Sequence, residues 1–159
     1  MPRLTTVAFA FASVTLATAV SAATQVQRTI PFDASAGGGE KVRQECQIQT
    51  HVPEALREAA GDVVLVDKLD NKGRVLELSI SEVHAPGGGI FSGPKWMAVS
   101  GKLYEKSKMI GSFRAKRLST GASLRGTCAT LQRCSRAIGQ DIPRWLEHPG
   151  MNAELGDAR

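Results

Sequence analysis

The chain has 159 residues, of which 42% are hydrophobic and 22% are charged, and its formal net charge is +5. This length allows one globular domain of ordinary size, and the composition excludes the disordered and collagen-like classes of protein. No uncharged apolar run long enough to cross a membrane follows the N-terminal segment, which excludes an internal membrane span.

Residues 1–23 are typical of a secretory signal peptide. Arg3 supplies a positive charge, residues 7–20 form an uncharged apolar stretch, and small residues surround Ala22 near the expected cleavage point. The absence of a cysteine just after this stretch disfavours a lipid anchor. We therefore expect a periplasmic or secreted chain without a transmembrane span after cleavage. Its single domain should cover residues 24–149, followed by a loose tail over residues 150–159.

The first half of the expected domain begins with a strand and a helix. Residues 25–32 alternate in part and predict the strand. Residues 40–60 carry apolar side chains at three- and four-residue steps, which predicts a helix that is kinked or broken by Pro53. The alternative is an extended segment up to Thr50, with a short helix that has Pro53 in its first turn.

Two hairpins are predicted next. Residues 63–69 and 74–83 are separated by turn-forming residues and predict a hairpin with one wet face. Residues 96–104 and 108–118 predict a second hairpin, in which Met109 should point inward.

The last predicted element is an amphipathic helix, because six residues that step by three and four fall on one helix face. They are Cys128, Leu131, Ser135, Ile138, Ile142 and Trp145. The order of elements predicts an α+β domain: an antiparallel sheet of four or five strands with two helices packed on one face.

The three cysteines predict at least one disulfide, since an exported chain meets an oxidising compartment. Cys46 pairing with Cys128 or Cys134 would join the first helix to the last, and a Cys128–Cys134 bridge requires Cys128 to precede the helix. One thiol stays free in each pairing. Zinc binding by Cys46, His51, Cys128 and Cys134 is disfavoured, because their spacing matches no standard motif. No metal or other cofactor is expected.

Basic residues concentrate in one block of the chain. Residues 95–144 hold 11 Lys and Arg against two acidic residues, whereas residues 24–94 hold 7 basic and 10 acidic residues. This block could be an ordinary solvated face or a face for an anionic partner. The candidate residues for that face are Lys102, Lys106, Lys108, Arg114, Lys116, Arg125 and Arg133.

A glycine-rich stretch between the predicted hairpins is a second candidate site. It matches neither a phosphate-binding loop nor a dinucleotide-binding motif, because Pro94 separates Gly93 from Lys95 and Ser92 replaces the last glycine. A flexible connection is the simpler interpretation, and a ligand loop is the functional one. The residues of the ligand loop would be Gly87, Gly88, Gly89, Phe91 and Trp96.

Several motifs together resemble a family of small, exported, uncharacterised bacterial proteins. They are Gly87–Gly89 with Ser92–Lys95, Ile110–Ala115, Gly126–Cys128, and Cys134 with Gly139, Asp141, Ile142, Trp145 and Leu146. The resemblance covers residues 73–149. It extends more loosely to lipoproteins of unknown function whose layout is similar to the TolB N-terminal domain. It implies a periplasmic α+β domain that binds or assists and assigns no binding residue.

The sequence therefore predicts an exported envelope protein that is not an enzyme. A binding or accessory module would use the basic face toward an envelope protein or an anionic surface, such as phospholipid, lipopolysaccharide or cell-wall polymer. Nucleic acid is disfavoured by export and by the lack of aromatic residues among the basic strands. The alternative is a thiol-dependent hydrolase or redox protein that uses Cys46 or the leftover free cysteine. A third possibility is a structural domain of a larger envelope assembly.

Overall fold

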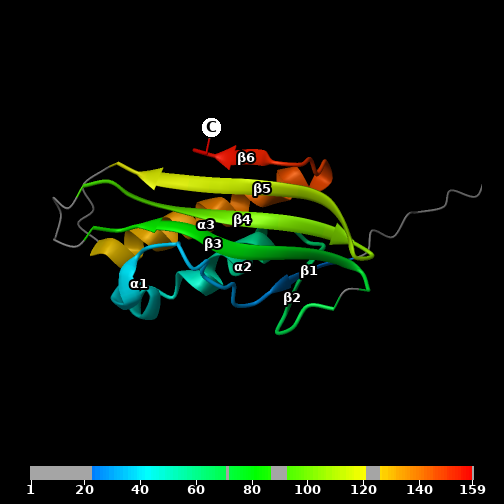
Figure 1. The fold of residues 1–159 in the computed structure, drawn as a ribbon, viewed down its shortest axis with the longest axis horizontal. Helices are drawn as coiled ribbons and strands as arrows, with labels where there is room; N and C mark the ends of the chain where they lie inside the picture. The colour runs from blue at the N-terminus through cyan, green and yellow to red at the C-terminus, as the bar shows by residue number, and fades with distance from the viewer. Residues whose placement is uncertain (1–22, 71, 87–92, 121–125, 159) are drawn as a thin grey trace, which may run out of the picture.

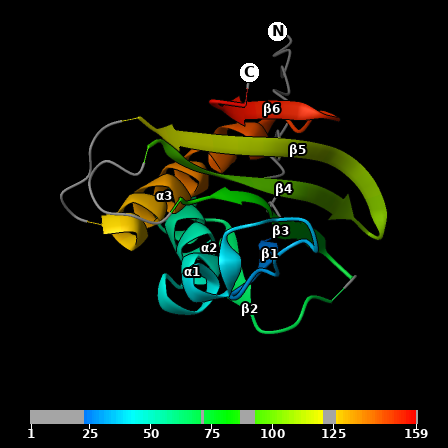
Figure 2. The same ribbon diagram turned by 60° about the vertical axis from the view of Figure 1, so that its left-hand side comes forward.

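A computed structural model describes residues 23–70, 72–86, 93–120 and 126–158. Its strands form one six-stranded mixed sheet in the order β2-β1-β3-β4-β5-β6 (Figures 1 and 2). They are β1 (Thr24–Gln27), β2 (Val63–Val66), β3 (Arg74–His84), β4 (Lys95–Glu105), β5 (Lys108–Ser119) and β6 (Ala153–Gly156), and the helices are α1 (Gly39–Glu45), α2 (Ile48–Ala59) and α3 (Gly126–Glu147).

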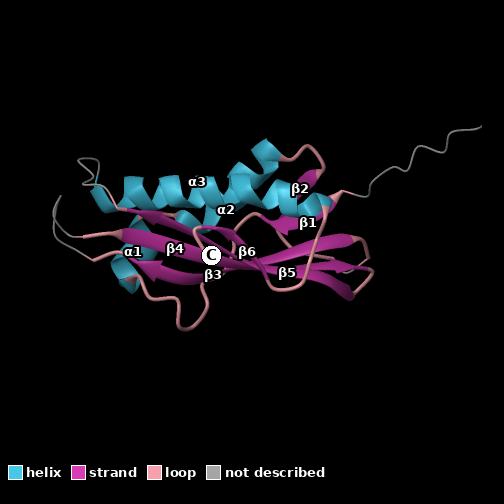
Figure 3. Cartoon of the chain, turned by 90° about the horizontal axis from the view of Figure 1, so that it is seen from above, coloured by secondary structure: helices cyan, strands magenta, loops and turns pink. Residues whose placement is uncertain are grey.

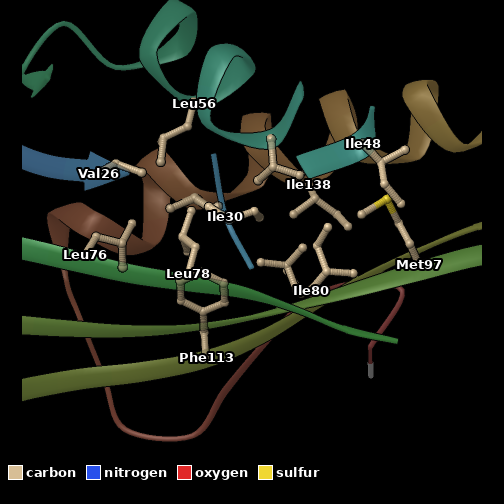
Figure 4. Close-up of a cluster of buried hydrophobic side chains, with 14 of the residues drawn as sticks. Val26, Ile30, Ile48, Leu56, Leu76, Leu78, Ile80, Met97, Phe113 and Ile138 are labelled. Atoms are coloured by element: carbon tan, nitrogen blue, oxygen red, sulfur yellow. The ribbon is translucent and has the colours of Figure 1, made fainter. Parts of the chain in front are cut away.

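Helices α2 and α3 pack side by side on one face of the sheet, and α1 is not part of this layer (Figure 3). The two helices approach closely at Gly139 of α3, where an added Cβ would lie 2.7 Å from the Cβ of Ala55 and 2.7 Å from the carbonyl oxygen of Val52. The hydrophobic core lies between this helix layer and the sheet (Figure 4). The opposite face of the sheet, which α2 and α3 leave uncovered, is called the helix-free face below.

The second predicted hairpin and the last predicted helix are confirmed. β4 and β5 pair antiparallel, and α3 buries Leu131, Ser135, Ile138, Ile142 and Trp145. α3 continues through Pro143 without a break. Among the described residues, no helix is long and apolar enough to span a membrane.

The prediction of helices on one face of a sheet holds, but the purely antiparallel sheet of four or five strands is wrong. The first predicted hairpin does not form, because β1 lies between β2 and β3 and pairs with both in parallel. Pairing with β1, which is distant in the sequence, replaces the direct pairing of β2 with β3 that the turn-forming residues 70–73 predicted. At the other edge, β6 pairs in parallel with β5, so residues 153–156 of the expected loose tail belong to the sheet.

Two local expectations are also corrected. The helical segment breaks at Gln47, which adopts the left-handed conformation with φ 48°, whereas Pro53 lies inside α2. Met109 is 40% exposed, because a register shift beside Leu103 pairs it with Tyr104 and turns it outward.

Candidate functional site

Strand alternation divides the side chains of β4 between the two faces of the sheet. Met97, Val99 and Leu103 are fully buried under the helices. Trp96 and Lys102 therefore lie on the helix-free face. The register places His84 of β3 opposite Trp96.

Five side chains from three strands meet on this face, and we call them the Trp96 cluster. They are Glu82, His84, Trp96, Arg114 and Lys116. The imidazole of His84 stacks on the indole of Trp96 with 3.7 Å between ring centroids and 12° between planes. The Lys116 Nζ atom lies 5.0 Å from the Trp96 ring centroid, within the range of a cation–π interaction.

Glu82 is the anion of the cluster. Its Oε1 accepts a hydrogen bond of 2.6 Å from the Trp96 indole N–H, and its Oε2 accepts one from Arg114 Nη2. Lys116 Nζ lies 3.8 Å from the same Oε2 atom. The bond from Trp96, followed by the charges of Lys116 and Arg114, lowers the pKa of Glu82. A single carboxylate thus faces two cations, and the Arg114 side chain remains 42% exposed.

The structure brings together only some of the residues predicted for the basic face. Lys102, Arg114 and Lys116 share the helix-free face, whereas Lys106 and Lys108 lie at the turn between β4 and β5. Arg133 is exposed on α3, on the other side of the sheet. Arg125 lies outside the described residues, as do Gly87, Gly88, Gly89 and Phe91 of the predicted ligand loop.

The basic block is also divided by ion pairs that the sequence did not reveal. Arg117 points to the helix layer, where Asp141 of α3 accepts hydrogen bonds from its Nε (2.8 Å) and Nη2 atoms, and Asp157 lies 3.4 Å from its Nη1 atom. The hydrogen bonds with Asp141 raise the pKa of Arg117. Charge counted along the chain missed this division, but alternation along β5 separates Arg117 from Arg114 and Lys116.

Glu82 was not singled out from the sequence, and His84 was not among the residues predicted for the basic face or the ligand loop. Both lie at the end of β3, just before the glycine-rich stretch, and no local motif distinguishes them. The bulge between Ile80 and Glu82 turns Glu82 onto the helix-free face opposite Ala98. Polar residues recur along β3 at Glu77, Ser79 and Ser81, so the polar character of Glu82 and His84 did not distinguish them.

The cysteines form a Cys46–Cys128 disulfide with a Cα–Cα distance of 4.7 Å. It joins the end of α1 to the start of α3, as one of the predicted pairings does. Cys134 is free and buried, and burial raises the pKa of its thiol. Since the disulfide occupies Cys46 and Cys128, these residues are not available as metal ligands in this state.

A cavity of about 580 Å³ lies at the C-terminal end of α3, away from the Trp96 cluster. Arg74, Asp62 and Glu147 are its charged lining residues. Arg74 Nη2 donates a 2.7 Å hydrogen bond to the carbonyl oxygen of Leu146, so this arginine caps the helix end. We therefore assign Arg74 a structural role.

Comparison with known proteins supports the fold. No family model and no curated protein matches the sequence. A Xanthomonas campestris protein of the DUF330 family is 12% identical, with a TM-score of 0.55 over 80% of this chain and 84% of that one. A hypothetical Chlamydia trachomatis protein, CT253, is 10% identical, with a TM-score of 0.51 over 74% and 94%.

A minor lipoprotein from Acinetobacter baumannii aligns over 79% of this chain and 87% of its own with 13% identity, but its TM-score of 0.35 does not establish a shared fold. The two better matches share only the fold with this chain at such low identity. The resemblance to small bacterial proteins of unknown function is thereby confirmed, and the looser likeness to the TolB N-terminal domain stays a prediction.

Proposed function

We propose that the protein is an exported binding or accessory module, not an enzyme, and that the Trp96 cluster holds an acidic carbohydrate polymer of the bacterial envelope. The observation that supports this proposal most directly is the arrangement of two cations and one carboxylate around Trp96 on the helix-free face. The disulfide is compatible with the oxidising compartment that an exported chain would enter.

The chemistry of the cluster fits this ligand class. A guanidinium has five N–H donors, and Arg114 directs one of its nitrogens to Glu82, so other donors remain for a carboxylate or phosphate group. Lys116 adds a second positive charge on the same face. The Trp96 and His84 rings supply an apolar surface beside these charges, against which a sugar ring can pack.

The test is retention of the pure protein on immobilised lipopolysaccharide and on an acidic cell-wall polymer, at low and high salt. The variant R114Q/K116Q should bind at least tenfold more weakly, and binding of the unaltered protein should fall with salt because exposed charges are screened. R133Q/R136Q is the matched control, since it removes the same charge from the outer side of α3. Equal loss in both variants, or retention that salt does not change, would contradict the proposal. Loss of phospholipid-vesicle binding in R114Q/K116Q that equals its loss on these polymers would do the same, because the Trp96 cluster would then not distinguish the polymer from lipid.

The thiol-dependent alternative now depends on Cys134, because Cys46 lies in the disulfide. Burial and a raised pKa both reduce the thiolate needed for nucleophilic attack. We expect the folded, non-reduced protein to show no reactive thiol and the unfolded protein to show one per chain. A thiol that reacts in the folded protein would revive this alternative.

A further inference from the structure

The turn between β4 and β5 combines basic and apolar exposed residues at one end of the sheet. Lys106 and Lys108 are exposed, and Met109 follows with 40% of its surface exposed. Met151 is 52% exposed. It lies beside the same part of β5, because the Ser112 N–H donates a 3.0 Å hydrogen bond to the carbonyl oxygen of Gly150. We call Lys106, Lys108, Met109 and Met151 the hairpin tip.

A neighbouring loop adds another positive charge to this end. The backbone N–H of Lys106 donates a 3.1 Å hydrogen bond to the carbonyl oxygen of Gly73, which places the exposed Lys72 next to the turn. Glu105 is the acidic residue within the turn itself. Asp70 is a second acidic residue nearby, because its carboxylate accepts a 3.1 Å hydrogen bond from the Lys72 backbone N–H. The three lysines exceed these two carboxylates by one positive charge.

Folding of the turn does not explain why lysine occupies it. Lys106 and Ser107 adopt φ values of 48° and 68°, the left-handed conformations of a two-residue hairpin loop. Asn and Gly adopt these conformations at lower cost than Lys. Lysine therefore occupies this position at a conformational cost, and a positive charge is the property that Asn and Gly lack.

The first residue of β1 lies at the same end of the sheet as the hairpin tip. Thr24, the first residue of β1, pairs with Arg74, and Arg74 pairs with Glu105 at the start of the turn. The sequence before Thr24 includes the uncharged apolar residues 7–20. Before this segment is cleaved, it joins the fold at the end that carries the hairpin tip.

From this juxtaposition we infer that the hairpin tip docks on a bilayer of anionic phospholipid. The lysines bind lipid phosphates, and the methionine side chains enter the interface between headgroups and acyl chains. This inference does not rest on the proposed function, because Trp96 and Glu105 are nine residues apart on one strand, about 30 Å. The Trp96 cluster would then face an envelope polymer away from the bilayer surface.

Flotation with lipid vesicles tests the inference, using the protein from Ala23 onward, which contains every described helix and strand. Vesicles of phosphatidylglycerol and phosphatidylcholine should bind the protein, and vesicles of phosphatidylcholine alone should bind it much more weakly. The variant K106Q/K108Q should lose binding about 25-fold, at about fivefold for each lysine. M109S/M151S should also weaken binding, with less effect on its salt dependence.

Two controls make the outcome decisive. R133Q/R136Q removes the same net charge from α3, and R114Q/K116Q alters the Trp96 cluster, so both should bind vesicles as the unaltered protein does. Circular dichroism of each variant confirms that it is folded. Absence of binding to the anionic vesicles would overturn the inference. An equal loss in K106Q/K108Q and R133Q/R136Q, or unchanged binding by K106Q/K108Q, would also overturn it.

Discussion

The covered face and the helix-free face of the sheet differ in the interactions that order their side chains. On the covered face, Met97, Val99 and Leu103 are fully buried under α2 and α3, and the charge of Arg117 is matched by Asp141 of the helix layer. On the helix-free face, the Trp96 cluster forms an ordered network that no helix of the layer covers. Burial explains the order of the covered face, whereas the order of the helix-free face comes from hydrogen bonds and ion pairs among exposed side chains, which the proposed function would use for binding.

The largest expected effect concerns the covalent link between the end of α1 and the start of α3. Replacing both cysteines of the disulfide, C46A/C128A, should lower the free energy of unfolding by about 4 kcal/mol, because the bridge closes a loop of 82 residues. Urea unfolding followed by circular dichroism measures this loss. A reductant should destabilise the unaltered protein by a similar amount and leave the variant unchanged. A loss below about 1 kcal/mol would show that the fold is maintained without the covalent link between α1 and α3.

Two neighbours on β4 compare the faces directly. Leu103→Ala empties a fully buried site under the helices and should cost about 3 kcal/mol of unfolding free energy. Lys102→Ala, one residue earlier and on the helix-free face, should change the unfolding free energy by no more than about 0.5 kcal/mol. The same urea titration measures both. Similar costs for the two variants would mean that the helix-free face is itself part of the packed core.

The sequence predicted the buried side chains of the covered face better than the residues that meet on the helix-free face. The apolar steps of residues 131–145 and the alternation of residues 97–103 identified the buried side chains, because burial imposes a local period. The positions of β1 and β6 could not be predicted, since parallel pairing depends on residues far apart in the chain. No local period marks residues 153–156 as a strand.

The candidate site was predicted only in part for the same reason. Trp96, Arg114 and Lys116 were identified from the glycine-rich stretch and the basic block, but Glu82 and His84 come from a different strand. The basic block also seemed continuous along the chain, whereas the fold separates Arg114 from Arg117. Charge per segment therefore overestimated the positive charge available on one face.

These two arginines of β5 provide the third comparison. Arg117→Gln removes hydrogen bonds to Asp141, whose side chain is only 19% exposed, and should cost about 2 kcal/mol of unfolding free energy. Arg114→Gln breaks a more exposed ion pair and should cost less than about 1 kcal/mol. Anion binding should respond in the opposite order, with a loss in R114Q and little change in R117Q. A larger stability loss in R114Q would show that the Trp96 cluster stabilises the fold.

The smallest expected effect on stability is at Glu82, and it depends on pH. The folded protein lowers the pKa of Glu82 below its ordinary value of 4.5, first through the Trp96 hydrogen bond and then through Lys116 and Arg114. The stability from its charge is therefore complete above pH 4.5 and is lost as the pH falls through the lower, folded value. Because the side chain is 35% exposed, Glu82→Gln should cost less than about 1 kcal/mol at pH 7. The difference from the unaltered protein should shrink at pH 3.5 in urea titrations at both pH values.

The same variant separates stability from binding on the helix-free face. Glutamine at position 82 keeps an oxygen for the Trp96 N–H but removes the carboxylate that competes with an anionic ligand for Arg114 and Lys116. E82Q should therefore bind the acidic polymer more tightly, by roughly fivefold, while its stability falls slightly. Weaker binding by E82Q at pH 7 would show that Glu82 positions the cations for the ligand. That result would exclude the interpretation that the Glu82 carboxylate stabilises the helix-free face slightly while lowering its affinity for the ligand. Glu82 would then be part of the binding site.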